Sequence, residues 1–519
     1  MKRIITLLLA LVMLFSMTAC NGNKKNGTTV IEGLDFEIGD TGGLEVPFGN
    51  GEEIEIFCTD EVGAENTYIF DKLGQILGLK ITPMLAPVST VSQKRTIVLA
   101  SGDLPDIISA NTLLQSNEFA MQGAFEPINP YMDKLPNVSR YFGKDGKYSW
   151  VAKSFAATDG QLYVFPQVDS SRLVNHGMLY RKDIFDKHGI EMWDSPETFY
   201  QALKKLKELY PDSYPLTSKT GKNIVTNYSL AWGGLRCYDT YYDEETKLWK
   251  YADTAPETKE LLDYLHKLYK EGLLDPEFLT NTQPAWTTKM TNGKSFVTYD
   301  WIGRLDMFVE QSTIPGYDLR YGNPVGPRQT LITLDQVNVG GVSVSKSKNS
   351  ELAMKVMDFL YSDAGAELMT CGIRGETFEI GEDGFAVYLD PELQAKEKVD
   401  IMDLRAKYCM WMAGSYVRTD HRSCYYKYSE RETEAQEWVD KCAGLEPADP
   451  VVTFVGDSMS RITDLKTALT KKFEEVMFKY IVGQATGDEA WNKWLAEAKK
   501  LGEDELCKIY NDRHKELGL

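Results

Sequence analysis

The feature that most constrains the fold is an alternation of strand and helix patterns between residues 53 and 108. Glu53–Phe57 alternates apolar and polar residues as a strand does, and Asn66–Leu77 then places its apolar residues on one helical face before Gly78. The alternation continues as a strand, a helix and a strand over residues 79–84, 91–100 and 104–108. This β-α-β-α-β order predicts an α/β fold with a parallel sheet.

A second series of strands and helices follows residue 166. Its expected strands are 173–180, 295–299 and 336–344, and its expected helices are 182–188, 195–209, 258–271, 350–361 and most of 457–518. In the helix that ends near residue 209, Ser195 is the expected N-cap, and Pro196 and Thr198 take the first and third helical positions. A chain of 519 residues exceeds what one hydrophobic core usually holds, so we expect two lobes.

The N-terminus has the pattern of an export signal. Lys2 and Arg3 precede an apolar run, residues 4–15, that is too short to cross a bilayer. Met17–Cys20 resembles the bacterial lipobox, in which cleavage before the cysteine leaves it to be acylated. We therefore expect a lipoprotein signal peptide over 1–19, with a lipidated Cys20 and a flexible linker over 20–50. The alternative is an ordinary signal peptide with a chance cysteine.

Composition excludes several classes of function. The net charge of −19 repels nucleic acid and anionic lipid, so neither is an expected partner. The five histidines and the cysteines form none of the usual zinc, redox or haem motifs, so we expect no cofactor and no metal. Seven cysteines follow Cys20, an odd number that cannot pair completely, and the sequence leaves open which are bridged or free.

An enzyme is a weaker interpretation of this chain. No GxSxG nucleophile motif is present, and no carboxylate pair stands out among the 76 acidic residues as a candidate acid and base. A secreted carbohydrate-active enzyme and a glycan adhesin stay open as alternatives.

Several segments together resemble one known family. They are the SGDLPDII stretch at 101–108, YRKD at 180–183 with SPETF at 195–199, NGKSF at 292–296 with Trp301, the strand and helix of 342–361, GIRGE at 372–376 and KYIVG at 479–483. The chain resembles the family 1 extracellular solute-binding lipoproteins of bacterial sugar ABC importers, relatives of maltose-binding protein, and especially their long lipoprotein branch. Residues 379–455 match nothing in that pattern.

The resemblance implies a two-lobed periplasmic-binding-protein-like fold of the class II type. Each lobe would be a mostly parallel sheet flanked by helices, with the ligand cleft at the hinge. The expected lobes are 51–166 plus about 336–395, and 167–335 plus about 396–519.

The resemblance also implies the function. The protein would be a monomer, anchored through Cys20 at the outer face of the bacterial cell membrane, that captures a carbohydrate and delivers it to the permease subunits of an ABC importer. A neutral oligosaccharide is favoured, and a peptide or an acidic sugar is the alternative.

The expected ligand-binding residues follow strand ends, where ligands of open sheets bind. Trp301, preceded by Asp300, would stack on a sugar ring, since sugar sites combine aromatic faces with hydrogen-bonding groups. The other candidates in such loops are Asp60, Glu65 and Asn66 after the first strand and Asp106 and Asn111 in the loop of the third. Asp60 and Glu65 could instead cap a helix, and Asp106 could merely fix a turn.

Three further candidates lie elsewhere. Trp232 sits beside two glycines, which permit a close approach, although it could be a core residue. Arg374 and Glu376 could bind sugar or could pair across the hinge, and Arg374 would suit an acidic ligand if it faced the cleft.

Overall fold

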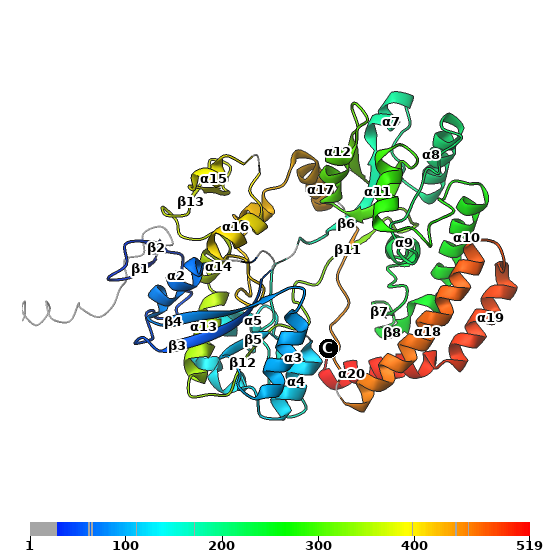
Figure 1. Ribbon diagram of the computed structural model, residues 1–519. Helices are drawn as coiled ribbons and strands as arrows, with labels where there is room; N and C mark the ends of the chain where they lie inside the picture. The colour runs from blue at the N-terminus through cyan, green and yellow to red at the C-terminus, as the bar shows by residue number, and fades with distance from the viewer. Residues whose placement is uncertain are drawn as a thin grey trace, which may run out of the picture. The chain divides into compact units, whose positions relative to one another are not determined.

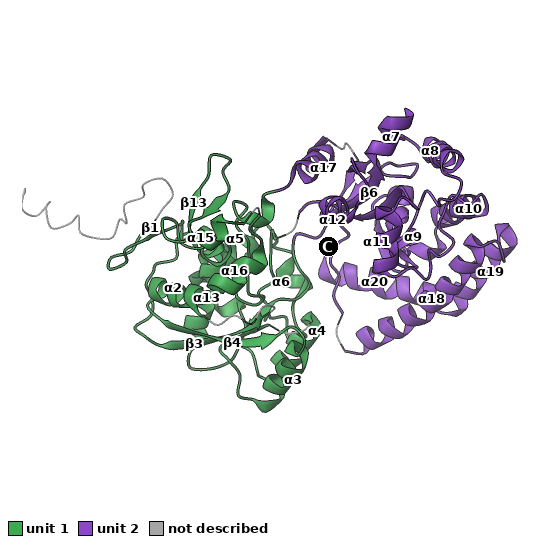
Figure 2. Cartoon of the chain, turned by 45° about the horizontal axis from the view of Figure 1, so that its top comes forward, with its two compact units in different colours: residues 1–170, 337–427 green, residues 171–336, 428–519 purple. Residues whose placement is uncertain are grey.

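The computed structural model describes residues 29–519 except 61, 62, 64, 65, 110, 111, 171, 397, 442, 443 and 455. The predicted signal peptide and Cys20 lie outside the described residues. The chain divides into two compact units, coloured separately in Figure 2. Unit 1 comprises residues 1–170 and 337–427, and unit 2 comprises residues 171–336 and 428–519.

The sheet of unit 1 confirms the predicted β-α-β-α-β series (Figure 1). Its strand order is β12-β5-β3-β4, in which β3 runs parallel to β4 and β5, and β12 is antiparallel to β5. The strands are β3 (Glu53–Asp60), β4 (Lys80–Pro87), β5 (Ile107–Ser109) and β12 (Val342–Val344). The carboxyl ends of β3 and β5 therefore lie at the same edge of the sheet as the start of β12.

Helices surround this sheet. They are α2 (Tyr68–Leu77), α3 (Val91–Ser101), α4 (Leu113–Met121), α5 (Pro136–Phe142), α6 (Val151–Ser154), α13 (Ser350–Tyr361), α14 (Asp363–Thr370), α15 (Pro391–Gln394) and α16 (Ile401–Tyr408), with short 3-10 turns at Asn129–Lys134 and Cys424–Tyr426. In α2, the apolar face predicted from the sequence is buried, and Gly78 ends the helix in the left-handed conformation.

Residues 29–50 do not behave as the flexible linker that the sequence suggested. β1 (Thr29–Val30) pairs antiparallel with β2 (Glu37–Ile38), and four apolar side chains of this stretch are buried: Ile31, Phe36, Ile38 and Leu44. The Ala364 backbone N–H donates to the Asp40 carbonyl at 3.0 Å. Burial of these side chains outweighs the polar composition around them, so the folded body starts before Glu53.

The second lobe boundary also lies elsewhere than expected. We assigned residues from about 396 onward to lobe 2, whereas 396–427 belong to unit 1. The Asn66 amide donates to the Ala406 and Lys407 carbonyls at the end of α16, and the Trp411 indole donates to the Thr370 carbonyl at 2.8 Å. The Asn66 contacts span 340 and 341 positions and the Trp411 contact spans 41, so no local pattern could reveal them. The β13 strand (Phe378–Ile380), paired with β14 (Ala386–Tyr388), precedes this segment.

The main sheet of unit 2 differs from the mostly parallel sheet that we expected. Its order is β10-β6-β9, and both pairs are antiparallel. The strands are β6 (His176–Arg181), β9 (Val297–Trp301) and β10 (Leu319–Gly322). Parallel pairing occurs at Leu216, which forms isolated bridges to Leu274 and Val297. The sequence predicts strands where β6 and β9 lie but none at β10, and strand direction depends on which distant segments pair.

Helices and short ribbons complete unit 2. The helices are α7 (Lys182–His188), α8 (Pro196–Leu209), α9 (Asn223–Gly233), α10 (Pro256–Lys270), α11 (Gln283–Thr291), α12 (Arg304–Gln311), α17 (Glu430–Lys441), α18 (Asp457–Ile481), α19 (Gly487–Lys500) and α20 (Glu503–Leu517), with a 3-10 turn at Ala252–Thr254. The ribbons are β7 (Thr240–Asp243) with β8 (Leu248–Tyr251), and β11 (Leu331–Ile332) with β15 (Leu445–Glu446). Figures 1 and 2 show α18 and α19 side by side, and α18 also contacts α10.

The predicted start of α8 is confirmed in detail. The Ser195 hydroxyl accepts a hydrogen bond from the Thr198 backbone N–H at 3.2 Å, and the Thr198 hydroxyl accepts one from the Ser195 N–H at 3.0 Å. This reciprocal capping box satisfies two N–H groups that the helix itself cannot pair.

Replacing Ser195 with alanine should therefore lower the free energy of unfolding by about 1 kcal/mol. Urea denaturation followed by circular dichroism would measure the change. A Ser101→Ala variant, at the C-terminal end of α3, is the control and should stay within about 0.5 kcal/mol of the wild type. An equal loss in both variants would contradict the capping role.

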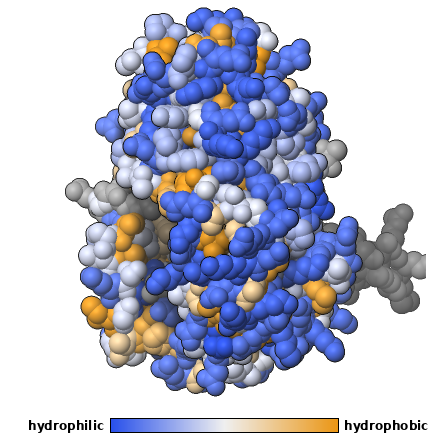
Figure 3. Space-filling view, turned by 90° about the vertical axis from the view of Figure 1, so that its right-hand side faces the viewer, coloured by the Kyte–Doolittle hydropathy of each residue, from blue (hydrophilic) through white to orange (hydrophobic). Residues whose placement is uncertain are grey.

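The surface and the cysteines add two facts. The face drawn in Figure 3 is mostly hydrophilic, with hydrophobic residues in small separate groups. Among the described residues, no helix is both long enough and apolar enough to cross a membrane. Within the same residues the free cysteines are Cys58, Cys237, Cys371, Cys409, Cys424 and Cys507.

Candidate functional site

An exposed tryptophan ends strand β9 in unit 2. Val297 to Asp300 are buried, whereas the Trp301 side chain that follows is 51% exposed. A large aromatic surface left in water at a strand end is costly unless something covers it, and it provides a flat apolar face for a ligand. The sequence analysis selected this residue, and the structure places it where a ligand can reach it.

His176 supports the indole from the neighbouring strand. It is the residue of β6 directly opposite Trp301, and the two rings meet edge to face with centroids 5.6 Å apart. On its other side His176 stacks on Tyr299. Burial lowers the pKa of His176, and the nearby Asp300 carboxylate only partly opposes this shift. The imidazole is therefore neutral at physiological pH and acts as a packing surface.

Asp300 is buried, whereas we expected it to bind the ligand. The side chain is 4% exposed, and its Oδ1 accepts hydrogen bonds from the Trp301 backbone N–H at 2.8 Å and from the Arg304 Nε at 3.4 Å. Its Oδ2 lies 3.3 Å from the Lys219 Nζ. With both oxygens engaged by protein groups, Asp300 positions two cations beside Trp301 and does not present an open acceptor for a sugar hydroxyl.

Lys219 reaches this site because of the pairing around Leu216. Leu216 bridges Val297 in parallel, so residues after Leu216 and residues after Val297 run toward the same edge of the sheet. Arg304, the first residue of α12, approaches from the other side, with its guanidinium 6.0 Å from the Trp301 ring centroid. Trp301 is thus an aromatic face bordered by two hydrogen-bond donors that carry positive charge.

Unit 1 has a pocket of its own, about 340 Å³ in volume. Among the described residues, its lining comes from the ends of β3 and β5, from helix α3, from the start of β12 with the residues before it, and from two loops: Thr59, Arg95, Ser109, Phe165, Gln167, Asn338, Gly340, Gly341, Val342, Ala413, Gly414, Tyr416 and Val417. This is the edge where ligands of open α/β sheets bind. The volume falls within the range of small-molecule sites.

Glycines and polar groups shape this pocket. A Cβ on Gly341 would lie 2.1 Å from the Phe165 carbonyl oxygen, so only glycine permits this approach of two backbones. The Arg95 Nη2 donates to the Ser109 hydroxyl at 3.4 Å, and Arg95 is 8% exposed. Burial raises the pKa of Tyr416, which keeps its phenol protonated and able to donate. The pocket thus combines several hydrogen-bonding groups with apolar walls.

Three of the predicted residues near the first and third strands hold the fold together. Asp60 ends β3 and accepts a hydrogen bond from the Gly63 N–H at 2.9 Å. Asn66 joins α2 to α16 through its amide. Asp106 precedes β5, at the opposite edge from the pocket, and its carboxylate binds the Glu55 N–H and the Ser347 hydroxyl. Asp106 therefore fixes local structure, as the alternative left open by the sequence has it, whereas Asp60 binds the turn at Gly63 and does not cap α2, whose N-cap is Thr67. Glu65 and Asn111 lie outside the described residues.

The remaining candidates make contacts within their own units. Trp232 is 6% exposed and packs on Tyr264 in the core of unit 2. Arg374 pairs with Glu367 at 2.7 Å, and Glu376 pairs with Lys72 at 2.7 Å. Both pairs are within unit 1, beside a broad surface hollow bordered by the β1–β2 hairpin. Arg374 therefore gives no reason to expect an acidic ligand.

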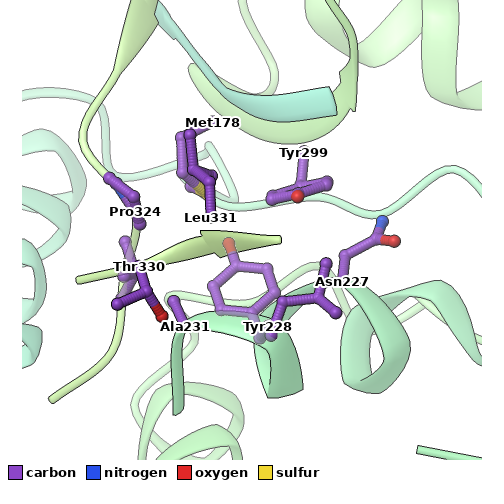
Figure 4. A pocket seen from close by; sticks show the side chains of 10 residues that line it. Met178, Asn227, Tyr228, Ala231, Tyr299, Pro324, Thr330 and Leu331 are labelled. Carbon is purple, nitrogen blue, oxygen red and sulfur yellow. The ribbon is translucent and has the colours of Figure 1, made fainter. Parts of the chain in front are cut away.

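A second cavity, in unit 2, is too small for a sugar. Figure 4 shows Tyr228 and Tyr299 around the same space as Met178 and Leu331. Its volume of about 10 Å³ is room for roughly one water molecule. The hydroxyls of Tyr228 and Thr330, which line it, have no hydrogen-bond partner among the described residues.

Sequence reasoning missed Lys219 and Arg304 in unit 2 and Arg95, Gln167 and Tyr416 in unit 1. Weak signals existed: the Gly340–Gly341 pair precedes a strand, and Lys219 lies in a polar loop that ends at Gly221. In the part of the chain that the structure describes, no group of three or more His, Cys, Asp or Glu residues could hold a metal ion.

Comparison with known proteins places the chain among relatives. A family model described as bacterial extracellular solute-binding protein matches residues 69–367, which is more than half of the chain. Lipoprotein LipO of Bacillus subtilis (strain 168) is 25% identical over 464 residues, which cover 85% of this chain and 87% of LipO.

Solved structures agree on the fold. The alginate-binding protein AlgQ2, in a crystal structure without calcium ion, superposes with a TM-score of 0.66 at 19% identity, covering 91% of this chain and 99% of AlgQ2. The ABC-transporter substrate binding protein FusA of Streptococcus pneumoniae, in complex with kestose, gives a TM-score of 0.63 at 18% identity, covering 90% and 99%. At such identities these likenesses show the two-lobed α/β fold alone. The extent of the family match shows more: the chain belongs to the bacterial extracellular solute-binding proteins.

Proposed function

We propose that the chain captures a carbohydrate outside the cell and delivers it to an ABC importer. The observation that carries the proposal is the exposed Trp301 indole, which His176 supports and which the donors Lys219 and Arg304 border. A sugar ring has an apolar C–H face that packs on an indole and hydroxyls that accept hydrogen bonds from flanking donors. This combination suits a sugar better than it suits a peptide or a metal ion.

The unit 1 pocket supports the same proposal. Its described lining includes side chains that donate or accept hydrogen bonds, Gln167, Asn338 and Tyr416 among them, and apolar walls such as Phe165. Recognition of hydroxyl groups requires such paired donors and acceptors. Similar proteins support it too: AlgQ2 is an alginate-binding protein, FusA was solved in complex with kestose, and NgtS of Streptococcus pneumoniae is an N-glycan transport solute binding protein.

Anchoring and chemistry complete the proposal. LipO is named a lipoprotein, and together with the lipobox-like Met17–Cys20 this supports acylation of Cys20 and attachment to the outer face of the cell membrane. We propose a monomer that binds its carbohydrate without cleaving it, since solute-binding proteins pass their ligands on intact.

A thermal-shift screen of the purified chain against neutral and acidic oligosaccharides tests this proposal. A sugar present at 100 times its Kd should stabilise the folded chain by about 2.7 kcal/mol. Trp301→Ala should weaken binding of that sugar by roughly 30-fold, because removal of a central aromatic contact costs about 2 kcal/mol.

Leu248→Ala is the matched control, since Leu248 is also an exposed apolar residue of unit 2 but lies on the β7–β8 ribbon. It should leave binding unchanged. Chromatography of the recovered sugar completes the test: shortened products would show an enzyme, and a panel without any binding sugar would contradict the proposed function.

A further inference from the structure

We propose that the captured carbohydrate carries an anionic oxygen group, a carboxylate or a sulfate, and that Lys219 and Arg304 in unit 2 recognise it. The inference rests on the proposed function and specifies its substrate class. It replaces the neutral oligosaccharide that the sequence favoured, and it depends on residues other than Arg374.

The charges around Trp301 are the first observation. Lys219 and Arg304 contribute two positive charges, and Asp300 contributes one negative charge. The side chains of Lys219 and Arg304 are 19% and 23% exposed, whereas that of Asp300 is 4% exposed. An approaching ligand therefore meets the cations and not the carboxylate that holds them.

His176 does not change this balance. It lies against Trp301 and Tyr299, and burial keeps its imidazole neutral. Lys219, Arg304 and Asp300 together thus carry one net positive charge beside the exposed Trp301 indole. A ligand with a carboxylate or sulfate next to the stacked ring would form charge-assisted hydrogen bonds there, which are stronger than those that a hydroxyl forms.

The unit 1 pocket provides a second, independent observation. Arg95 is the charged side chain among the described residues that line it. Its guanidinium lies 5.6 Å from the Phe57 ring centroid, and its Nη2 binds the Ser109 hydroxyl, so the planar group is held at the pocket wall. Arginine keeps its charge at neutral pH, and a planar fork of N–H groups matches the geometry of a carboxylate.

The overall charge of the chain makes this arrangement informative. The protein carries a net charge of −19, yet both candidate surfaces present positive side chains. Repulsion from distant acidic residues is largely screened beyond about 8 Å at physiological ionic strength, so the neighbouring cations dominate. A ligand without charge would gain less from Lys219 and Arg304 than an anionic one.

Matched pairs of sugars test the proposal. The probes are short oligomers of galacturonate, mannuronate and guluronate with their carboxyl-reduced counterparts, and sulfated oligosaccharides with their desulfated counterparts. Calorimetry should find an anionic member that binds, with affinity at least about tenfold higher than that of its neutral counterpart. The two sets of pairs distinguish a carboxylate from a sulfate.

The other outcomes separate this inference from the proposed function. If neutral oligosaccharides bind and no anionic one does, or if removal of the charge leaves affinity unchanged, the inference is overturned and the proposed function stands. If no sugar of either kind binds, both fail.

Variants of the chain test the residues themselves. Lys219→Met should weaken binding of the anionic sugar at least about tenfold and that of its neutral counterpart much less, while Asp300 keeps Arg304 as partner. Lys259→Met is the control, because Lys259 of α10 has a similar exposure, 24%, and pairs with Asp263 and Asp488. It should leave both affinities unchanged.

Arg304→Gln provides a second variant if Lys219→Met does not fold, and the same difference between the two sugars is expected. Equal losses for the anionic sugar and its neutral counterpart would show a structural role and overturn the assignment.

Discussion

Replacing Asp253 with asparagine should make the chain more stable than the wild type at pH 8, by roughly 4 kcal/mol, and should leave its stability unchanged near pH 3.5. Burial raises the pKa of the Asp253 carboxyl from its ordinary value of 3.8 to about 7. Between these values the folded chain holds a proton that the unfolded chain has released. The contribution of Asp253 to the free energy of unfolding of the wild type therefore falls as the pH rises from 3.8 to about 7, and it stays constant above that pH.

The surroundings of Asp253 explain both the shift and the choice of asparagine. The residue is fully buried, and its Oδ1 accepts a hydrogen bond from the Tyr238 N–H at 2.7 Å. The hydrogen bonds from the Tyr251 phenol and the Tyr238 N–H lower the pKa of Asp253 and only partly oppose the effect of burial. Asparagine keeps the Oδ1 acceptor and replaces the ionisable oxygen with an amide donor, which imitates the protonated acid without a charge.

Urea denaturation of both chains from pH 3.5 to pH 8 measures this effect. Asp243→Asn is a control for which we expect the opposite effect, because the pKa of Asp243 is lowered to about 2. Burial alone would raise this pKa, but hydrogen bonds from Lys250, Thr246 and Glu245 stabilise the carboxylate and outweigh burial. That variant should lose stability relative to the wild type at neutral pH and match it in acid. Parallel curves for the wild type and Asp253→Asn would show that Asp253 does not titrate in this window.

Replacing Glu367 with alanine should lower the free energy of unfolding by about 3 kcal/mol. The Glu367 side chain in α14 is 5% exposed and binds both Arg374, at 2.7 Å, and Arg422. Removing it leaves two guanidinium groups facing a site that was built for a carboxylate. Each remaining arginine is about one third exposed, so water compensates part of the loss.

Denaturation with urea at pH 7 tests this prediction. Glu379→Ala is the control, since Glu379 is an exposed residue of β13 near Arg374, and its effect should stay within about 0.5 kcal/mol. Glu367→Gln should lie between the two, because an amide keeps an acceptor but loses the charge. If Glu367→Ala loses as little stability as Glu379→Ala, the two ion pairs do not hold residues 371–427 to the rest of unit 1.

Local patterns predicted much of this fold. The strands and helices between residues 53 and 108, the capping box at Ser195 and the position of Trp301 at a strand end all depend on residues close in sequence. Hydrophobic periodicity and capping chemistry act over a few positions, so they can be read without the fold.

The expectations that the structure contradicts concern features that depend on contacts between distant parts of the chain. Strand directions in unit 2 depend on the pairing of β6 with β9 and β10, which lie more than a hundred residues later. The place of residues 396–427 depends on contacts of Asn66 and Glu367 with distant segments. No pattern within these stretches specifies such partners.

The site shows the same division. Trp301 was found because it follows a strand directly, whereas Lys219 comes near it through the bridge between Leu216 and Val297. Asp300 seemed an open acceptor because the approach of Lys219 depends on the fold, although Arg304 lies only four positions later in the sequence. Arg95 was overlooked because a single arginine on a weakly amphipathic helix gives no sign of burial.

A crystal structure of the chain with the carbohydrate that stabilises it most would test the central claim most directly. We expect the apolar face of one sugar ring to lie on the Trp301 indole, with oxygen atoms of the sugar within hydrogen-bond distance of Lys219 or Arg304. A carbohydrate bound elsewhere, with the Trp301 indole still exposed to solvent, would contradict the claim.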